Sequence, residues 1–419
     1  MSHNVVYLDY QATTPVDQRV LDAMLPFLTQ QYANPSSPHQ PGRRASSALR
    51  AARRQVKTSL GAEHDTEIVF TSGATEANHL AILGTATANP RPDADHIITT
   101  PIEHQSVLAT CDHLSRAGYS VTTVPVDHHG RVNPADVAGA ITPRTVLVSV
   151  MYANNEIGTI QPIADIAAIT RRHNVLLHTD AAQAIGALDI DVNRLGVDLL
   201  TISAHKIYGP KGIGALYIRR GTPLRPQYTG SQEHGFRAGT INLPGAIALA
   251  EALRILATER EHETLRIAQL RDTLADRLLA ALPHAHINGS PEHRLPGNLS
   301  LTIPGIDAAD LIDALPDLAI SNGSACASGH AKPSHVLTAI GLTDSDARAT
   351  IRLSLGRETR ESDIKHTAHR IGSSVATTPL PGYALATMLS ASTAASTSRS
   401  KTPHERTPAK VNKNRVVDL

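Results

Sequence analysis

The stretch Val197-Asp-Leu-Leu-Thr-Ile-Ser-Ala-His-Lys206 is the most informative part of this chain. Its apolar, partly β-branched first half predicts a short buried strand, and the turn residues Gly209-Pro-Lys-Gly212 follow soon after. A lysine at a strand end beside a histidine is well placed to form a Schiff base with an aldehyde cofactor. Most lysines near strand ends are solvated surface residues, so this stretch alone leaves the chemistry open.

Short β-branched runs alternate with helical patterns over the first half of the chain. Because such alternation requires crossover connections, it predicts an α/β fold with a mainly parallel sheet and helices on both faces. Strands are expected at residues 67–71, 96–100, 120–124, 145–150 and 175–179, and helices at 42–60, 74–88, 105–116 and 163–172.

The second half of the chain predicts a smaller α+β domain. One long Ala- and Leu-rich helix is expected at 242–282, then strands at 297–303 and 350–355 and helices at 308–315, 334–340 and 361–373. We expect a large domain over 15–255 and a small domain from 1–14 and 256–376. An Ala/Ser/Thr-rich and then basic tail, 377–419, is predicted to be disordered.

Composition excludes several classes of protein. The 419 residues carry a formal net charge of +1, which gives no general reason to expect direct nucleic acid binding. No apolar run is long enough to span a membrane, and the first residues lack a signal-peptide pattern. Only two cysteines are present, which favours a reducing, cytoplasmic location, and no metal-binding spacing occurs.

Polar side chains follow several predicted strands, at the sheet edge where ligands of α/β proteins collect. Thr71-Ser-Gly-Ala-Thr-Glu76 opens a helix and could bind a phosphate, although an ordinary helix cap is the simpler interpretation. His104, the Asn154-Asn155-Glu156 loop and Asp180 follow three further strands. Lysine, an acid for a ring nitrogen, a stacking ring and a phosphate cup together predict a pyridoxal 5'-phosphate site.

These residues lie in motifs that resemble the cysteine desulfurases of the class V aminotransferase-like, fold-type I pyridoxal phosphate enzymes. The resemblance covers about residues 5 to 373 and excludes the tail. It rests on the segments 7–15, 34–37, 71–78, 152–156, 178–183, 203–206 and 352–357, together with His104.

The resemblance implies a role for each matching residue. Lys206 would hold the cofactor and move protons, Asp180 would pair with the pyridine nitrogen, and Gln183 would bind the phenolic oxygen. His104 would stack on the ring and act as a catalytic residue that relays protons. The phosphate would be bound by Ala74, Thr75, Ser203 and His205, and by Thr240 of a neighbouring subunit, which implies a homodimer. Asn34, Asn155 and Arg352 would bind the carboxylate of the L-cysteine substrate.

The small-residue segment Ser321-Asn-Gly-Ser-Ala-Cys-Ala-Ser-Gly-His330 resembles the long nucleophile loop of group I desulfurases. A lone cysteine among Gly, Ser and Ala is a poor packing residue. By resemblance Cys326 would attack the substrate sulfur as a thiolate, take it as a persulfide, release L-alanine and pass the sulfur to an acceptor protein. Cys111, within a predicted helix, is expected to be a buried structural residue.

Three questions stay open at this level. A selenocysteine lyase or another relative that depends on pyridoxal phosphate could carry the same residues. A non-catalytic scaffold paralogue is a second alternative, although the intact Lys206, Asp180, His104 and Cys326 argue against it. The sulfur could serve iron–sulfur cluster assembly, tRNA thiolation or DNA phosphorothioation, and the tail departs from the scaffold-docking segment of the iron–sulfur housekeeping enzymes.

Overall fold

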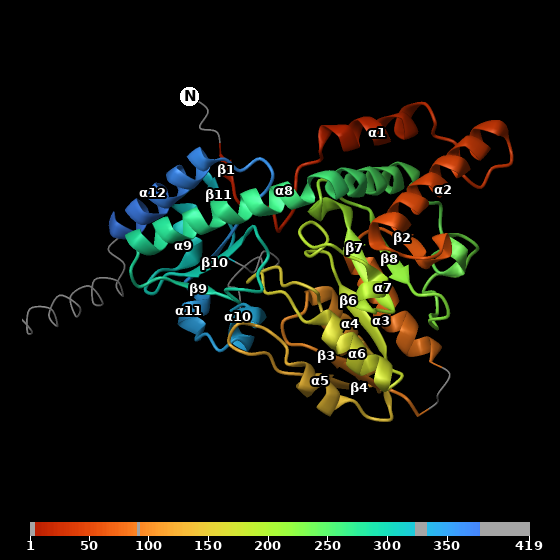
Figure 1. Cartoon of the computed structure of the whole chain (residues 1–419), viewed down its shortest axis with the longest axis horizontal. Coiled ribbons are helices and arrows are strands. Elements are labelled where there is room, and N and C mark those ends of the chain that lie inside the picture. The colour runs from red at the N-terminus through yellow and green to blue at the C-terminus, as the bar shows by residue number, and fades with distance from the viewer. Residues whose placement is uncertain (1–4, 90–92, 323–332, 378–419) are drawn as a thin grey trace, which may run out of the picture.

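A computed structural model describes residues 5–89, 93–322 and 333–377 of the chain. The largest sheet in this part of the chain has seven strands. Figure 1 shows helices around this sheet and, beside it, a smaller group of strands and helices, with the long helix α8 (Leu243–Ala281) running across both. None of the described helices combines the length and apolar character needed to cross a membrane.

The large sheet has the strand order β2-β8-β7-β6-β5-β3-β4. Its strands are β2 (Ile68–Thr71), β3 (His96–Thr99), β4 (Ser120–Thr123), β5 (Thr145–Ser149), β6 (Leu176–Asp180), β7 (Leu199–Ser203) and β8 (Gly214–Ile218). Five of them, β4, β3, β5, β6 and β7, pair in parallel, as the alternating pattern predicts. Their carboxyl ends therefore meet at one edge.

Strand β8 was not predicted, and it makes one end of the sheet antiparallel. It pairs antiparallel with both β7 and β2, so the expectation of a parallel crossover is wrong for β2. The physical reason is the short connection: only Ala204–Ile213 separates β7 from β8, which is enough for a tight return but not for a crossover helix. The fold class, a mainly parallel sheet flanked by helices, is confirmed.

Helices cover both faces of this sheet. α2 (Gln40–Leu60) shows why such a helix forms here: His39 caps its first turn, and Gly61, with φ 69°, ends it in the left-handed conformation that glycine favours. Its apolar residues at Ala45, Leu49, Ala52, Val56 and Leu60 repeat every three or four positions and are buried.

The other helices around the large sheet are α1 (Gln18–Thr29), α3 (Ala74–Ala88), α4 (Gln105–Arg116), α5 (Pro134–Ala140), α6 (Ile163–Arg172) and α7 (Val192–Leu195). The bounds of α3, α4 and α6 agree with the predicted ones, while α1, α5 and α7 were not predicted. Val69 and Phe70 are adjacent in β2 and belong to different apolar clusters, so their side chains pack on opposite faces of the sheet.

The smaller group contains an antiparallel sheet of β9 (His286–Asn288), β10 (Asn298–Thr302) and β12 (Thr350–Ser354). The two-residue strands β1 (Val6–Tyr7) and β11 (Leu318–Ala319) pair in parallel beside it. Its helices are α9 (Ala308–Asp313), α10 (His335–Ala339), α11 (Asp344–Arg348) and α12 (Glu361–Thr377), and α12 packs along α8. A separate apolar cluster joins β10 and β12 to the last third of α8.

Candidate active site

Lys206 ends the single-turn helix Ala204–Lys206 that follows β7. Its Nζ atom donates to the backbone oxygens of Gln11, at 2.6 Å, and Ala12, at 2.8 Å. The neighbouring His205 lies 3.2 Å through Nδ1 from the Thr13 hydroxyl, and burial lowers the pKa of His205 to about 4, so its ring is neutral at neutral pH. The N-terminal segment thus lines the site beside the lysine.

Asp180, the last residue of β6, is buried at the same sheet edge. Its carboxylate accepts from Asn78 Nδ2 at 2.6 Å and from the backbone N–H of Ala182 at 2.9 Å. Within the described residues no lysine or arginine forms an ion pair with it. A buried carboxylate with only neutral donors favours a cationic ligand group such as a pyridinium N–H.

His104 caps the N-terminus of α4 and is linked to Asp180 through two intermediate side chains. Its Nδ1 lies 2.7 Å from the Ser106 hydroxyl, and Ser106 Oγ accepts from Asn78 Nδ2 at 2.9 Å. Because Asn78 also donates to Asp180, the expected stacking ring and the expected acid share one hydrogen-bonded chain. Burial is the main cause that lowers the pKa of His104, so its ring is neutral at neutral pH.

The N-terminus of α3 is open toward the same edge. Gly73 precedes it with φ 156° and ψ −178°, and no side chain caps the helix. The backbone N–H groups of Ala74 and Thr75 therefore stand at the positive end of a 15-residue helix dipole, where an anionic phosphate is stabilised. The buried Ser203 lies at the end of β7, two strands away in the sheet.

Arg352, on β12, brings the smaller sheet to this site. Its side chain is 3% exposed; Nη2 pairs with Asp9 Oδ1 at 2.6 Å and Nη1 donates to the backbone oxygen of Asn155 at 2.9 Å. Its Nε is buried without a hydrogen-bond partner among the described residues. The structure therefore brings Arg352 and Asn155 together and leaves one donor of the guanidinium for a ligand.

Three other sequence-predicted residues have fewer contacts with this group. Gln183 donates from Nε2 to the backbone oxygen of Gln11 at 2.9 Å, which places it beside Lys206. Asn34 is exposed between α1 and α2, and its Oδ1 accepts from the backbone N–H of Ser36. Thr240 is exposed just before α8.

Cys326 lies outside the described residues, but both flanks of its segment are held at the site. On one side, the backbone of Ser321 exchanges two hydrogen bonds with Arg352. On the other side, Ser334 Oγ donates to Glu156 Oε2 at 2.5 Å, and His335 Nε2 lies 3.0 Å from the backbone oxygen of Glu103. Cys111 is buried as predicted, and burial raises its pKa to about 12.

The residues present fit pyridoxal 5'-phosphate. A pyridinium requires an anionic partner, which the Asp180 carboxylate supplies. A phosphate requires free N–H donors, which the uncapped N-terminus of α3 supplies, and an aldehyde requires an amine, which Lys206 supplies. In the described part of the chain, no cluster of three or more His, Cys, Asp or Glu side chains could hold a metal ion.

Sequence reasoning did not assign roles to Asn78, Gln11 or Asp9. Asn78 is fully buried on α3, and an amide on a helix rich in Ala and Leu is the signal that could have found it. Gln11 and Asp9 lie in the motif 7–15, but their partners Lys206 and Arg352 are 195 and 343 residues away. No local pattern predicts such pairs.

Comparisons with known proteins agree with this geometry. The model of the aminotransferase class-V family matches residues 6–366. A mitochondrial cysteine desulfurase of Arthroderma benhamiae is 47% identical over 366 residues, covering 86% of this chain and 72% of its own. A solved NifS-like protein superposes with a TM-score of 0.84 at 37% identity, covering 89% of this chain and all of its own. A structure of SspA in complex with cysteine gives a TM-score of 0.76 at 39% identity, covering 84% of this chain and 98% of its own.

Proposed function

The chain belongs to the class V aminotransferase family, and we propose that it is a cysteine desulfurase that converts L-cysteine to L-alanine and passes the sulfur to an acceptor. The observation that carries this proposal is the meeting of Lys206, Asp180 and Arg352 at one sheet edge, with both flanks of the Cys326 segment anchored beside Arg352 and Glu156. A similar solved protein is described in complex with cysteine.

Pyridoxal 5'-phosphate is the cofactor, and when bound it acts as an electron sink for the substrate carbons. Lys206 holds it, and Asp180 keeps the pyridine nitrogen protonated. Asn78 orients the Asp180 carboxylate by donating to Oδ2 at 2.6 Å. We assign the stacking position to His104, the phenolic oxygen to Gln183, and the phosphate to Ala74, Thr75, Ser203 and His205.

Arg352 binds the substrate carboxylate in this proposal. Its Nε is buried and free for an acceptor among the described residues, while Asp9 and the Asn155 backbone fix the rest of the guanidinium. The Asn155 side chain and, from its exposed loop, Asn34 complete the proposed carboxylate site. With the substrate held by its carboxylate, the Lys206 amine is the group that takes the proton from Cα.

The sulfur step then uses Cys326 as the nucleophile. Its thiolate attacks the substrate sulfur, so that the S–S bond forms while the Cβ–S bond breaks and its electron pair moves toward the substrate carbons. Protonation of Cβ gives L-alanine, and Cys326 retains the sulfur as a persulfide. The sum is cysteine plus a thiol giving alanine plus a persulfide, which balances without an external oxidant or reductant.

The experiment that tests this function separates the two cysteines. Cys326→Ser should keep the yellow, lysine-bound cofactor and release no alanine from L-cysteine. Cys111→Ala is the matched control, because Cys111 is buried in α4 with a pKa raised to about 12 and should be dispensable for turnover. Desulfurase turnover that survives in Cys326→Ser would overturn the assignment.

The quaternary state and the fate of the sulfur extend this proposal. We propose a homodimer in which Thr240 reaches a phosphate bound in the neighbouring subunit, supported by its exposed position before α8. We also propose a division into a large domain, 15–255, and a small domain, 1–14 with 256–376, in line with separate apolar clusters around the two sheets. A sulfur-acceptor protein and a cytoplasmic location complete the proposal.

A further inference from the structure

Tyr208, two residues after the proposed cofactor lysine, has a left-handed backbone with φ 64°. A bulky residue rarely adopts this conformation, and it persists only where the surrounding structure holds it there. Since Lys206 and Tyr208 are separated by one residue, whatever holds the turn at Tyr208 also limits where the lysine can lie.

Two residues of the N-terminal segment hold the backbone of Tyr208. Its N–H donates to the Thr14 hydroxyl at 2.8 Å, and its carbonyl accepts from the backbone N–H of Asp17 at 2.9 Å. Thr14 is tied to the same turn a second time, since its backbone N–H donates to the His205 carbonyl at 3.0 Å. The backbone N–H and the backbone carbonyl of Tyr208 are therefore both hydrogen-bonded to the N-terminal segment, residues 14–17.

The side chain of Tyr208 is held by Arg357, which follows β12. The backbone N–H of Arg357 donates to the Tyr208 hydroxyl at 2.6 Å, and its guanidinium carbon lies 4.1 Å from the centre of the ring. A guanidinium over an aromatic face is an attractive arrangement. Arg357 also pairs with Asp17 at 2.6 Å, so it contacts the residue that holds the Tyr208 carbonyl.

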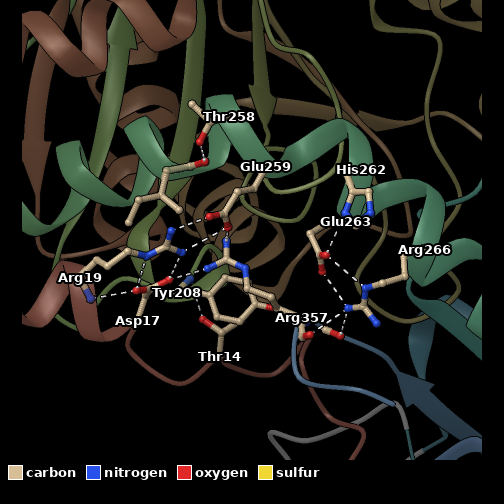
Figure 2. Close-up of polar contacts among 12 residues, drawn as sticks. Thr14, Asp17, Arg19, Tyr208, Thr258, Glu259, His262, Glu263, Arg266 and Arg357 are labelled. Atoms are coloured by element: carbon tan, nitrogen blue, oxygen red, sulfur yellow. Dashed lines mark hydrogen bonds and ion pairs between the residues drawn. The ribbon is translucent and has the colours of Figure 1, made fainter. Parts of the chain in front are cut away.

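A network of charges on α8 holds Arg357 in turn (Figure 2). Glu259 lies 3.5 Å from its guanidinium and pairs with Arg19 at 2.5 Å. Arg266, itself paired with Glu263, donates to the backbone oxygen of Arg357 at 2.8 Å. Both the side chain and the backbone of Arg357 are thus fixed to the helix that spans the two sheets.

Polar contacts and packing both hold this turn, since Ile207, between Lys206 and Tyr208, is buried in the main apolar cluster. Lys206, Tyr208 and Arg357 all line one cavity of about 110 Å³, together with Gln11, Gln183 and residues of α8. The turn therefore borders open space on the side of its polar groups, and there a displacement of about 1 Å is enough to change turnover. The Tyr208–Arg357 contact is one restraint that joins the lysine turn to the smaller sheet, and the hydrogen bond from the Gln11 N–H to Ser354 Oγ is a second.

We propose that Tyr208 and Arg357 are a pair of positioning residues that set the place of the Lys206 amine and couple it to β12. Arg352, the proposed carboxylate-binding residue, is the central residue of β12, and Arg357 lies three residues beyond the end of that strand. A substrate held by Arg352 is thereby connected to the lysine turn through the short segment between Arg352 and Arg357. This inference rests on the proposed function, because it assigns the pair a role in that reaction.

The test uses Tyr208→Phe and Arg357→Gln, with Arg254→Gln as a matched control. Arg254 pairs with Glu251 on the same helix and does not line the cavity. In the cofactor-loaded protein we expect both test variants to change the pH at which the absorbance of the lysine-bound cofactor changes. We also expect them to lower kcat roughly tenfold to hundredfold with a smaller change in KM for cysteine. The control variant should have the wild-type pH transition, the wild-type kcat and the wild-type KM.

Tyr208→Phe keeps the ring and the backbone contacts, so it decides the question even where Arg357→Gln does not fold. A loaded Tyr208→Phe protein with the wild-type pH transition and the wild-type kcat would overturn the inference. The absorbance titration needs no sulfur release. A wild-type protein that loads cofactor but releases no alanine would therefore count against the proposed function, while the titration would still test the pair.

Discussion

Arg352 Nη2 lies 2.6 Å from Asp9 Oδ1, so the proposed carboxylate-binding residue is already paired with a carboxylate of the chain itself. The guanidinium is buried and the Asp9 side chain is partly exposed. Asp9 therefore compensates a charge that would otherwise be costly to bury, and it also stands next to the place where a substrate carboxylate must bind. The Asp9 carboxylate therefore stabilises the substrate-free protein and weakens the binding of a substrate carboxylate.

Asp9→Asn is expected to separate these effects. An amide oxygen still accepts from Arg352 but no longer repels the substrate carboxylate, so KM for L-cysteine should fall several-fold. Loss of the counter-charge should lower the free energy of unfolding of the substrate-free protein by about 1–3 kcal/mol. Steady-state kinetics and denaturant unfolding measure both quantities. Asp22→Asn, an exposed position on α1, is the control, and a rise in KM for Asp9→Asn would contradict the prediction.

His104→Asn should separate the helix cap from the chemistry. His104 accepts the backbone N–H of Ser106 at 3.1 Å, and asparagine is a good N-cap residue, so stability should change by less than about 0.5 kcal/mol. The ring is lost, so kcat should fall by about a hundredfold and the cofactor absorbance should shift. His104→Ala, which loses the cap as well, should cost about 1 kcal/mol in thermal unfolding. Unchanged turnover in the asparagine variant would exclude the stacking role.

Glu103 predicts a pH dependence of stability. Burial raises its pKa to about 8, against the hydrogen bonds from Thr100 and the Met151 backbone. The folded protein therefore holds this proton when the unfolded chain, with a pKa of about 4.3, has lost it. Stability from this group is present below the unfolded pKa and decreases as pH rises toward 8, then levels off.

Glu103→Gln, which resembles the protonated carboxyl, should remove that slope. The unfolding free energy of the wild type relative to this variant should fall between about pH 5 and about pH 9, measured by denaturant titration at each pH. A constant difference across that range would show that Glu103 is ionised in the folded protein.

The buried pair of Arg53 and Glu233 should dominate the stability of the segment before α8. The two side chains meet at 2.5 Å, and Glu233 also accepts from the backbone N–H of Phe70 on β2. Glu233 and His234 have φ angles of 47° and 58°, a conformation that needs such an anchor. Arg53→Met should therefore cost about 3–5 kcal/mol in unfolding free energy, because it leaves a buried charge unpaired.

Arg54→Met is the neighbouring control for that substitution. Arg54 is exposed on the same helix, so its replacement should change stability by less than about 0.5 kcal/mol. If the two variants unfold alike, the Arg53–Glu233 pair contributes no net stability.

Much of the fold follows from local signals that the sequence carries. Helix α3 begins at Ala74 and ends at Ala88, as its Gly-rich start and apolar pattern predict. Strand β8 was not predicted, and its antiparallel direction depends on a tight return after β7. Hydrophobic periodicity carries no information on strand direction. Local patterns also predict that Lys206 and Asp180 lie at one edge, since Asp180 ends β6 and Lys206 follows the end of the parallel strand β7 by three residues.

The sequence by itself determined the α/β class, the family resemblance and the proposed identities of the cofactor lysine, its acid and the nucleophile Cys326. Only the tertiary structure decided that Arg352 pairs with Asp9, that Asn78 joins His104 to Asp180, and that Arg357 holds the turn at Tyr208. The physical reason is range. Periodicity, caps and turns act over a few residues, whereas these partners lie 28 to 343 residues apart. Asn78, Ser106 and Asp180 meet when α3 and α4 pack on the large sheet, and the Arg352 and Arg357 contacts form when the smaller sheet packs beside it.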